Sequence, residues 1–227
     1  IEPYRGAPFP DELWLEPACG TGRFLAEAAA RGLRVVGFDR SPAMLAFARG
    51  VAVSPLVERL FEADMIDFSS HVEAQSIAVA FSLDNTFRHL EDDRDAGRHL
   101  MELAAVLRAD GLAVIGLQLS EYGADPIEED VWIAPMGEAE ITQVVQYLPA
   151  PHRGDRRETV LSHTTIRHSS GREETREHRY ALRSYDVAQW HRLLRASPLQ
   201  LLGWSDFEGR ACSEPPLGYG FAVLGVR

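Results

Sequence analysis

Lysine is absent from this chain of 227 residues, and all 23 of its basic residues are arginine. This absence excludes Schiff-base chemistry and a lysine general base, because both need a side-chain primary amine. The 34 acidic residues give a net charge of −11, which disfavours a nucleic-acid substrate, since such a partner normally requires a basic face. The arginines between Arg153 and Arg183 are interleaved with carboxylates, which favours a solvated sheet face over a phosphate track.

Cysteine and long apolar runs are also scarce. The two cysteines, Cys19 and Cys212, make a poor disulfide framework. No apolar run approaches the length of a membrane span, and the first residues lack the basic and apolar segments of a secretory signal. We therefore expect a cytoplasmic protein with no membrane segment. The histidines show no H-x-x-x-H spacing, so no metal site is predicted.

Apolar strands alternate with helical stretches from about residue 13 to residue 119. This alternation predicts a parallel sheet with helices on both faces, and the length suits a single domain, 1–227. Glycine at 111 is expected to end the third helix. The predicted strands cover 13–15, 34–39, 61–65, 76–81 and 112–117, and the predicted helices 25–31, 42–49 and 94–108.

The pattern changes after Ser120. Residues 121–130 are acidic and loop-like, and strands are predicted at 140–148, 158–167 and 172–183. Their weak alternation is typical of an antiparallel sheet with one wet face. A helix at 185–195 and strands at 199–207 and 218–226 follow. We expect an α/β fold with a seven-stranded, mostly parallel sheet and an antiparallel cap, 121–183, inserted after the fifth strand.

Residues 16–24 are Glu-Pro-Ala-Cys-Gly-Thr-Gly-Arg-Phe, between an apolar strand and an alanine-rich helix. Gly20 and Gly22 permit positive φ and bring bare backbone close to a ligand at a helix N-terminus. The dinucleotide fingerprint fails here, because its third glycine would fall at Leu25. A carboxylate at Glu16 would receive an ammonium group or order the loop, and it would repel a pyrophosphate.

Another segment begins at Asp39, which ends the next predicted strand 17 residues beyond Gly22. An acidic residue at this place can accept both hydroxyls of a ribose. In the following residues Ser41 is a predicted N-cap and Pro42 the first helical residue. The two segments together resemble the first two motifs of class I S-adenosylmethionine-dependent methyltransferases, which have the patterns E-x-A-C-G-T-G-R and D-x-S-x-x-M-L.

This resemblance implies a Rossmann-like fold and S-adenosylmethionine as the cofactor. It implies that Asp64 holds the adenine amino group and that Met65 flanks the ring, whereas a turn or cap is the other interpretation of Asp64. Cys19 is expected to be a small packing residue beneath the cofactor. The cofactor-binding positions implied are Glu16, Ala18, Cys19, Gly20, Gly22, Asp39, Arg40, Met44, Asp64, Met65 and Ser82.

In the same family the tip of the fourth strand faces the transferred methyl group, so His89 and Asp84 are the catalytic candidates. His89 either removes a proton from the acceptor or caps and packs the following helix. Asp84 and Asn85 either orient the acceptor or form a turn. In the insertion, the aromatic side chains either cover the site or pack in a core; they are Trp132, Tyr147 and Tyr180.

The insertion is similar to that of glycine and amino-sugar N-methyltransferases. It implies an enzyme, monomeric or homodimeric, that methylates a small-molecule acceptor by direct in-line displacement and has no nucleic-acid partner. Two alternatives remain at this point. One is a non-catalytic S-adenosylmethionine sensor or regulatory subunit, and the other is a nicotinamide-dependent oxidoreductase, which Glu16 and Leu25 disfavour.

Overall fold

The computed structural model describes Tyr4, residues 11–124 and residues 126–227. The remaining positions of the expected domain 1–227 lie outside the described residues. The chain forms two compact units, one of Ile1–Leu119 with Val187–Arg227 and the other of Ser120–Asp186.

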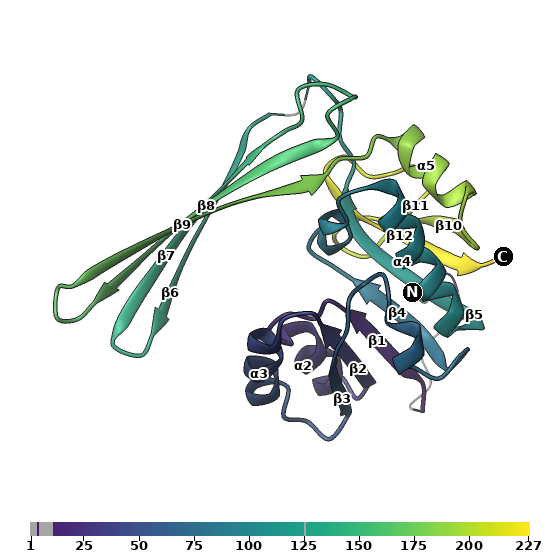
Figure 1. The fold of residues 1–227 in the computed structure, drawn as a ribbon, viewed down its shortest axis with the longest axis horizontal. Coiled ribbons are helices and arrows are strands. Elements are labelled where there is room, and N and C mark those ends of the chain that lie inside the picture. The colour runs from purple at the N-terminus through teal and green to yellow at the C-terminus, as the bar shows by residue number, and fades with distance from the viewer. Residues whose placement is uncertain (1–3, 5–10, 125) are drawn as a thin grey trace. The chain divides into compact units, whose positions relative to one another are not determined.

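The first unit is built on an eight-stranded sheet in the order β11-β10-β12-β5-β4-β1-β2-β3 (Figure 1). Neighbouring strands from β3 to β5 are parallel, whereas β12 is antiparallel to both β5 and β10. Seven strands match the expected sheet, and the eighth is the two-residue edge strand β11. The strands are β1 (Leu13–Pro17), β2 (Arg34–Asp39), β3 (Val57–Glu62), β4 (Ile77–Ser82), β5 (Leu107–Gln118), β10 (Leu199–Ser205), β11 (Ala211–Cys212) and β12 (Tyr219–Val226).

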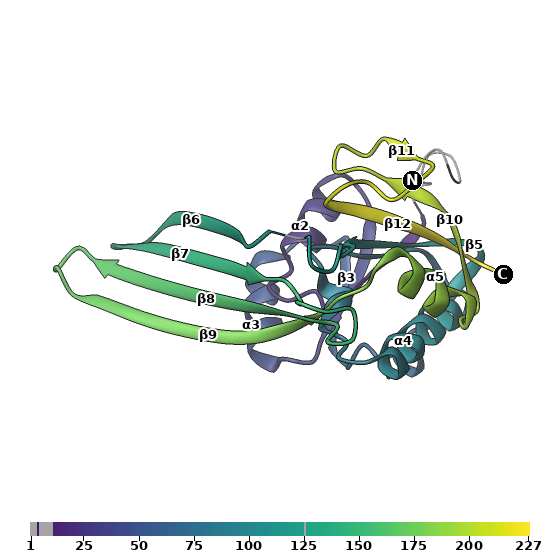
Figure 2. The same ribbon diagram turned by 90° about the horizontal axis from the view of Figure 1, so that it is seen from above.

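In the part of the chain that the structure describes from residue 11 onward, two pairs of helices cover this sheet. Helices α2 (Arg23–Ala30) and α3 (Pro42–Val51) pack against β2 and β3, and α4 (Asp93–Val106) packs with α5 (Val187–Arg195) against β10. Figure 2 shows α4 and α5 together on one side of β5, β10 and β12. The chain moves in opposite directions from β1 to β2 and from β4 to β5, and parallel crossovers are right-handed, so the two helix pairs lie on opposite faces.

Burial explains why β4 is central. All six of its residues are buried, as expected of a parallel strand covered on both faces. In the half of the sheet that runs from β4 through β5 and β12 to β10, α5 buries Trp190 against Phe87 and Trp204. The ring centroids are 5.4 Å and 6.5 Å away. These contacts join α5, β10 and the segment after β4, the short 3-10 helix η2 (Thr86–His89).

Two predicted boundaries are wrong. The helix expected at 94–108, with Gly111 as the residue just after its end, ends at Val106, and β5 begins at Leu107. Gly111 lies inside the strand, where a Cβ would come within 2.9 Å of the carbonyl oxygens of Arg108 and Ile77, so close backbone approach explains the glycine. The third strand ends at Glu62, and residues 64–65 lie in the turn after it.

The second unit is a four-stranded antiparallel sheet in the order β6-β7-β8-β9 (Figure 2). Its small core consists of Val145, Val160 and Leu182, with Tyr147 packed against it. The strands are β6 (Glu128–Met136), β7 (Ala139–Leu148), β8 (Arg157–His168) and β9 (Glu173–Arg183).

The expected loop at 121–130 is wrong at its end, because β6 begins at Glu128 and was not predicted as a strand. Every residue of β6 is exposed, so the alternation of apolar and polar residues that indicates a half-buried strand is missing. Charged side chains on an edge strand also discourage pairing with another chain.

Candidate functional site

The glycine-rich turn between β1 and α2 is the centre of the candidate site. Ala18, Gly20 and Gly22 all have positive φ, at 50°, 53° and 75°. The turn is anchored by Cys19, whose backbone N–H donates to Phe38 O at 2.8 Å. A Cβ built on Gly20 would meet no heavy atom within 4 Å. The sharp turn therefore presents bare backbone to open space at the carboxyl ends of β1 and β2.

Glu16 lies beneath this turn with only 4% of its surface exposed. The backbone N–H of Leu25, in the first turn of α2, donates to its carboxyl group, while Oε2 is buried with no hydrogen-bond partner. Burial raises the pKa of Glu16 to about 8, and the nearby carboxylates of Asp84 and Asp39 add to this, against the Leu25 amide and Arg23. Glu16 is thus a protonated carboxyl group near pH 7, with one oxygen that lacks a partner.

Asp39, at the end of β2, ties the turn to the second motif. Its Oδ2 accepts from Gly20 N and its Oδ1 from Ser41 N, both at 2.8 Å. Ser41 in turn caps α3 by accepting from Met44 N at 3.3 Å, as its sequence position predicted. The Met44 side chain is 44% exposed on the first turn of α3. The structure therefore brings the acidic group and the glycine turn into direct contact.

Cys19 and Gly37 pack against each other below the turn. Cys19 is buried, and burial together with Glu16 and Asp39 raises the pKa of its thiol to about 12. The thiol therefore stays protonated, which fits packing rather than nucleophilic chemistry. A Cβ on Gly37 would lie 2.5 Å from Leu25 Cδ1 and 3.2 Å from Cys19 Sγ, so only glycine allows this contact.

Asp64 and Met65 lie in the turn that follows β3. Asp64 Oδ1 accepts from Ile66 N at 3.2 Å, which is the geometry of the turn interpretation. Met65 is half-buried, and its carbonyl oxygen lies 2.8 Å from Nδ1 of the buried His99. The sequence indicates no role for His99, because the spacing of the histidines fits no metal site. Its position inside α4, 34 residues from Met65, left no local signal.

The segment after β4 begins with a strained turn. Ser82 is buried, and its Oγ has no hydrogen-bond partner. Asp84 and Asn85 both have positive φ, at 51° and 60°. Asn85 Oδ1 accepts from the backbone N–H of Gln118 at 2.9 Å, so this side chain joins the turn to the end of β5. The exposed carboxylate of Asp84 forms an ion pair with Arg23 at 2.9 Å.

Tyr219, on β12, was missed by the sequence analysis. Its hydroxyl oxygen accepts from Asp84 N at 2.8 Å, and burial raises the pKa of the phenol to about 12, so it remains protonated. Gly116 provides the room, because a Cβ there would collide with the Tyr219 ring. A contact between residues 135 positions apart has no signature in the local sequence.

His89 ends η2 and is exposed to solvent. Partial burial lowers the pKa of its imidazole, and the positive charges of Arg40 and Arg88 lower it further. The imidazole is therefore neutral near pH 7 and can accept a proton. Arg40 directly follows β2, and its charge lowers the pKa of His89. The end of β2 and the segment after β4 are therefore close enough to interact electrostatically.

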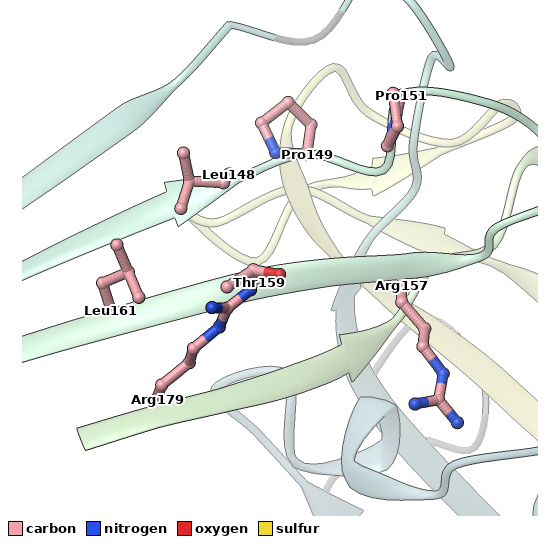
Figure 3. Close-up of a pocket in the computed structure, with 7 residues that line it drawn as sticks. All are labelled: Leu148, Pro149, Pro151, Arg157, Thr159, Leu161 and Arg179. Atoms are coloured by element: carbon pink, nitrogen blue, oxygen red, sulfur yellow. The ribbon is translucent and has the colours of Figure 1, made fainter.

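In the second unit, Trp132 is 51% exposed and Tyr180 41% exposed, so core packing describes only Tyr147 of the three aromatic candidates. A hollow of about 350 Å³ opens on this unit (Figure 3). Apolar walls with guanidinium groups suit a ligand with an apolar body and an anionic group. The lining residues are Leu148, Pro149, Pro151, Arg157, Thr159, Leu161 and Arg179.

Within the described part of the chain, no three residues of the types His, Cys, Asp and Glu come together as a metal site. The helices of that part include none with the length and apolar character needed to cross a membrane.

The geometry fits the expected S-adenosylmethionine. The unpartnered Glu16 Oε2 and Ser82 Oγ offer acceptors for a cationic amino group, and the space beside Gly20 is open. The chain matches the family described as "Methyltransferase domain" over residues 15–111, the segment that carries all of these groups.

A curated protein to which this chain is similar is the glycine/sarcosine/dimethylglycine N-methyltransferase of Actinopolyspora halophila. The two share 34% identity over 106 residues, which is 46% of this chain and 19% of the relative. The chain thus spans about a fifth of the length of that protein.

Solved structures share the fold over almost the whole chain. An S-adenosylmethionine-dependent methyltransferase from Clostridium acetobutylicum has a TM-score of 0.76 at 13% identity, covering 95% of this chain and 84% of its own. An amino pentose methyltransferase from Micromonospora echinaspora, solved with S-adenosylmethionine bound, has a TM-score of 0.71 at 19% identity, covering 96% and 85%. The insertion as well as the first unit therefore falls within the shared fold.

Proposed function

We propose that this protein is an S-adenosylmethionine-dependent methyltransferase that transfers the methyl group to a small-molecule acceptor by direct in-line displacement. The observation that carries the proposal is the buried Glu16 carboxyl group with its unpartnered oxygen beneath a turn of left-handed residues. An ammonium group would supply the missing partner and favour the ionised form of this carboxyl group, whereas a pyrophosphate has no donor to offer it. The names of the relatives support the same donor and an amine-bearing acceptor.

In this proposal Glu16 receives the amino group of the cofactor and Asp39 accepts from the ribose hydroxyls with lone pairs left free by Gly20 and Ser41. Ala18, Cys19, Gly20 and Gly22 shape the turn, and Ser82 donates or accepts at the floor of the site. Asp64 holds the adenine amino group with the oxygen not used by Ile66, and Met65 flanks the ring. Arg40 and Met44 complete the second motif beside them.

When bound, the cofactor supplies a methyl group on an activated sulfonium. The protein then has to orient the acceptor, exclude water and remove a proton where the acceptor must lose one. His89 is the proposed base, since its lowered pKa keeps the imidazole neutral near pH 7. Asp84 is the other catalytic candidate, with its backbone held by Tyr219.

The two compact units are proposed to act as one methyltransferase domain, with residues 121–183 as a cap that contributes to acceptor binding. The exposed aromatic side chains of Trp132 and Tyr180 support this role, because they are suited to contact a small organic acceptor. We propose a cytoplasmic enzyme, a monomer or homodimer without a nucleic-acid partner, in agreement with the net charge of −11.

Calorimetric titration of S-adenosylhomocysteine into the wild type and Asp39→Ala tests the cofactor assignment. The wild type should bind, and Asp39→Ala should bind at least about tenfold more weakly, because it loses charged hydrogen-bond acceptors and the Gly20 contact. Asp110→Ala, a change of an exposed carboxylate that pairs with Arg108, serves as the matched control and should bind like the wild type. Absence of binding to the wild type, or equal binding to Asp39→Ala, would contradict the proposal.

A further inference from the structure

Two side chains of helix α4 bind backbone groups of the turn that follows β3. His99 Nδ1 lies 2.8 Å from Met65 O. Glu102, three residues further along the helix and on the same face, accepts with Oε2 from Phe68 N at 2.8 Å and from Ser69 N at 2.6 Å. Three backbone groups of one short segment are therefore bound by two side chains of one helix.

The chemistry of His99 makes its contact specific. A carbonyl oxygen can only accept, so Nδ1 must carry the proton. The ring is fully buried, with the rings of Phe68 and Phe87 5.8 Å away, and Nε2 has no hydrogen-bond partner. Burial lowers the pKa of His99 to about 4, although the Met65 carbonyl and the carboxylates of Glu102 and Asp64 oppose this. A neutral imidazole in a single tautomer therefore donates to the turn.

Glu102 binds the same turn at its other end. It is half-buried, and both of its bonds reach main-chain N–H groups in or next to the short 3-10 helix η1 (Ser69–His71). A carboxylate that accepts two backbone N–H groups binds them more strongly than a neutral acceptor would. The turn is thus held at its beginning by a donor and at its end by an acceptor.

We propose that His99 and Glu102 are positioning residues for recognition of the cofactor's nucleobase. The inference rests on the proposed function, in which Asp64 and Met65 contact the adenine. Neither α4 side chain contacts the base in this proposal. Together they hold the turn so that the Asp64 carboxylate meets an exocyclic amino group, which distinguishes a 6-aminopurine from a 6-oxopurine.

The test compares dissociation constants for S-adenosylhomocysteine and S-inosylhomocysteine, in which an oxo group replaces the adenine amino group. The wild type should prefer the adenine compound. His99→Phe keeps a ring but removes the donor of one hydrogen bond, and Glu102→Leu removes the acceptor of two; each should reduce this preference about five- to tenfold. His99→Asn and Glu102→Gln each keep one suitable polar atom and should retain most of the preference.

Met101→Ala is the control, because Met101 lies between the two residues on the same helix but is 61% exposed. It should leave both dissociation constants unchanged. A wild type that binds neither compound would overturn the proposed function itself. If the wild type prefers the adenine compound and the folded His99→Phe and Glu102→Leu variants prefer it to the same degree, only the positioning role is overturned. Circular dichroism establishes folding, and if His99→Phe does not fold, the two Glu102 variants decide the question.

Discussion

At the scale of the residue, Glu16 combines three properties that rarely occur together in a carboxyl group. It is buried, it accepts a backbone N–H at the start of a helix, and one of its oxygens has no partner. A buried polar atom without a partner costs free energy of about 1–3 kcal/mol, so its retention is explained if a ligand supplies the partner. The raised pKa has the same origin, because a carboxyl group removed from water and left partly unpartnered favours its neutral form.

This leads to a prediction about protons. With a pKa of about 8, Glu16 is protonated at pH 7 in the ligand-free protein, and an ammonium neighbour favours the ionised form. Binding of S-adenosylhomocysteine at pH 7 should therefore release close to one proton, about 0.9 at most for this pKa, and affinity should rise with pH until about pH 8. Calorimetry in phosphate and in Tris measures the release as a difference in apparent enthalpy.

Glu16→Gln should abolish this proton release, whereas Glu27→Gln, a change on the exposed face of α2, should leave it intact. In the ligand-free protein the raised pKa of Glu16 acts in the opposite direction: stability, unlike ligand affinity, falls as pH rises. Because the folded state binds this proton more tightly than the unfolded state, the contribution of Glu16 to stability is complete below pH 4.5 and is lost as pH rises through about 8. Equal enthalpies in the two buffers would argue against a protonated Glu16.

At the scale of the element, the turn between β1 and α2 depends on its neighbour β2. Leu25 occupies the position of the third glycine in the dinucleotide fingerprint. Its side chain needs space that a glycine would not need. Gly37 on β2 provides that space, and Leu25 and Cys19 both pack against it. The small residue that allows close packing therefore lies on the adjacent strand instead of on the helix.

Gly37→Ala should consequently destabilise the fold by about 1–3 kcal/mol, because the added methyl group cannot be accommodated next to Leu25 Cδ1 without moving α2. Urea unfolding followed by circular dichroism measures this change. Gly97→Ala, inside α4, is the matched control: its Cβ would meet nothing within 4 Å, so a gain of about 0.5–1 kcal/mol is expected. A Gly37→Ala protein as stable as the wild type would show that the turn adapts freely.

At the scale of the whole molecule, the residues proposed for the cofactor all belong to the first unit, and the insertion is a separate compact unit. The two passages of the chain into and out of the insertion lie side by side, because Ser120 N donates to Tyr185 O at 2.9 Å. A short linker can therefore replace the insertion without stretching the chain.

Replacement of residues 121–184 by a short glycine-serine linker should leave binding of S-adenosylhomocysteine close to that of the full chain. Methyl transfer to a panel of glycine and amino-sugar acceptors should be lost, since the cap proposed to contact the acceptor is gone. Calorimetry and release of S-adenosylhomocysteine are the two measurements. A folded shortened protein that still methylates the same acceptors would refute the role of the cap.

The sequence by itself determined the strand–turn–helix around Gly20 and Gly22, the acidic end of β2 and the cap of α3. These features depend on residues close together in the chain, where backbone freedom, capping and strand ends follow local rules. Strand β6 was not predicted, because it pairs with β7 while all of its residues stay exposed, and it therefore lacks the alternation of apolar and polar residues that indicates a strand.

Only the tertiary structure decided which distant groups contact the candidate site. Tyr219 reaches Asp84 through the antiparallel insertion of β12 next to β5, and His99 reaches Met65 through the packing of α4. Such contacts form because burial forces polar atoms to find partners, and which atoms meet depends on sheet order and helix packing rather than on local sequence.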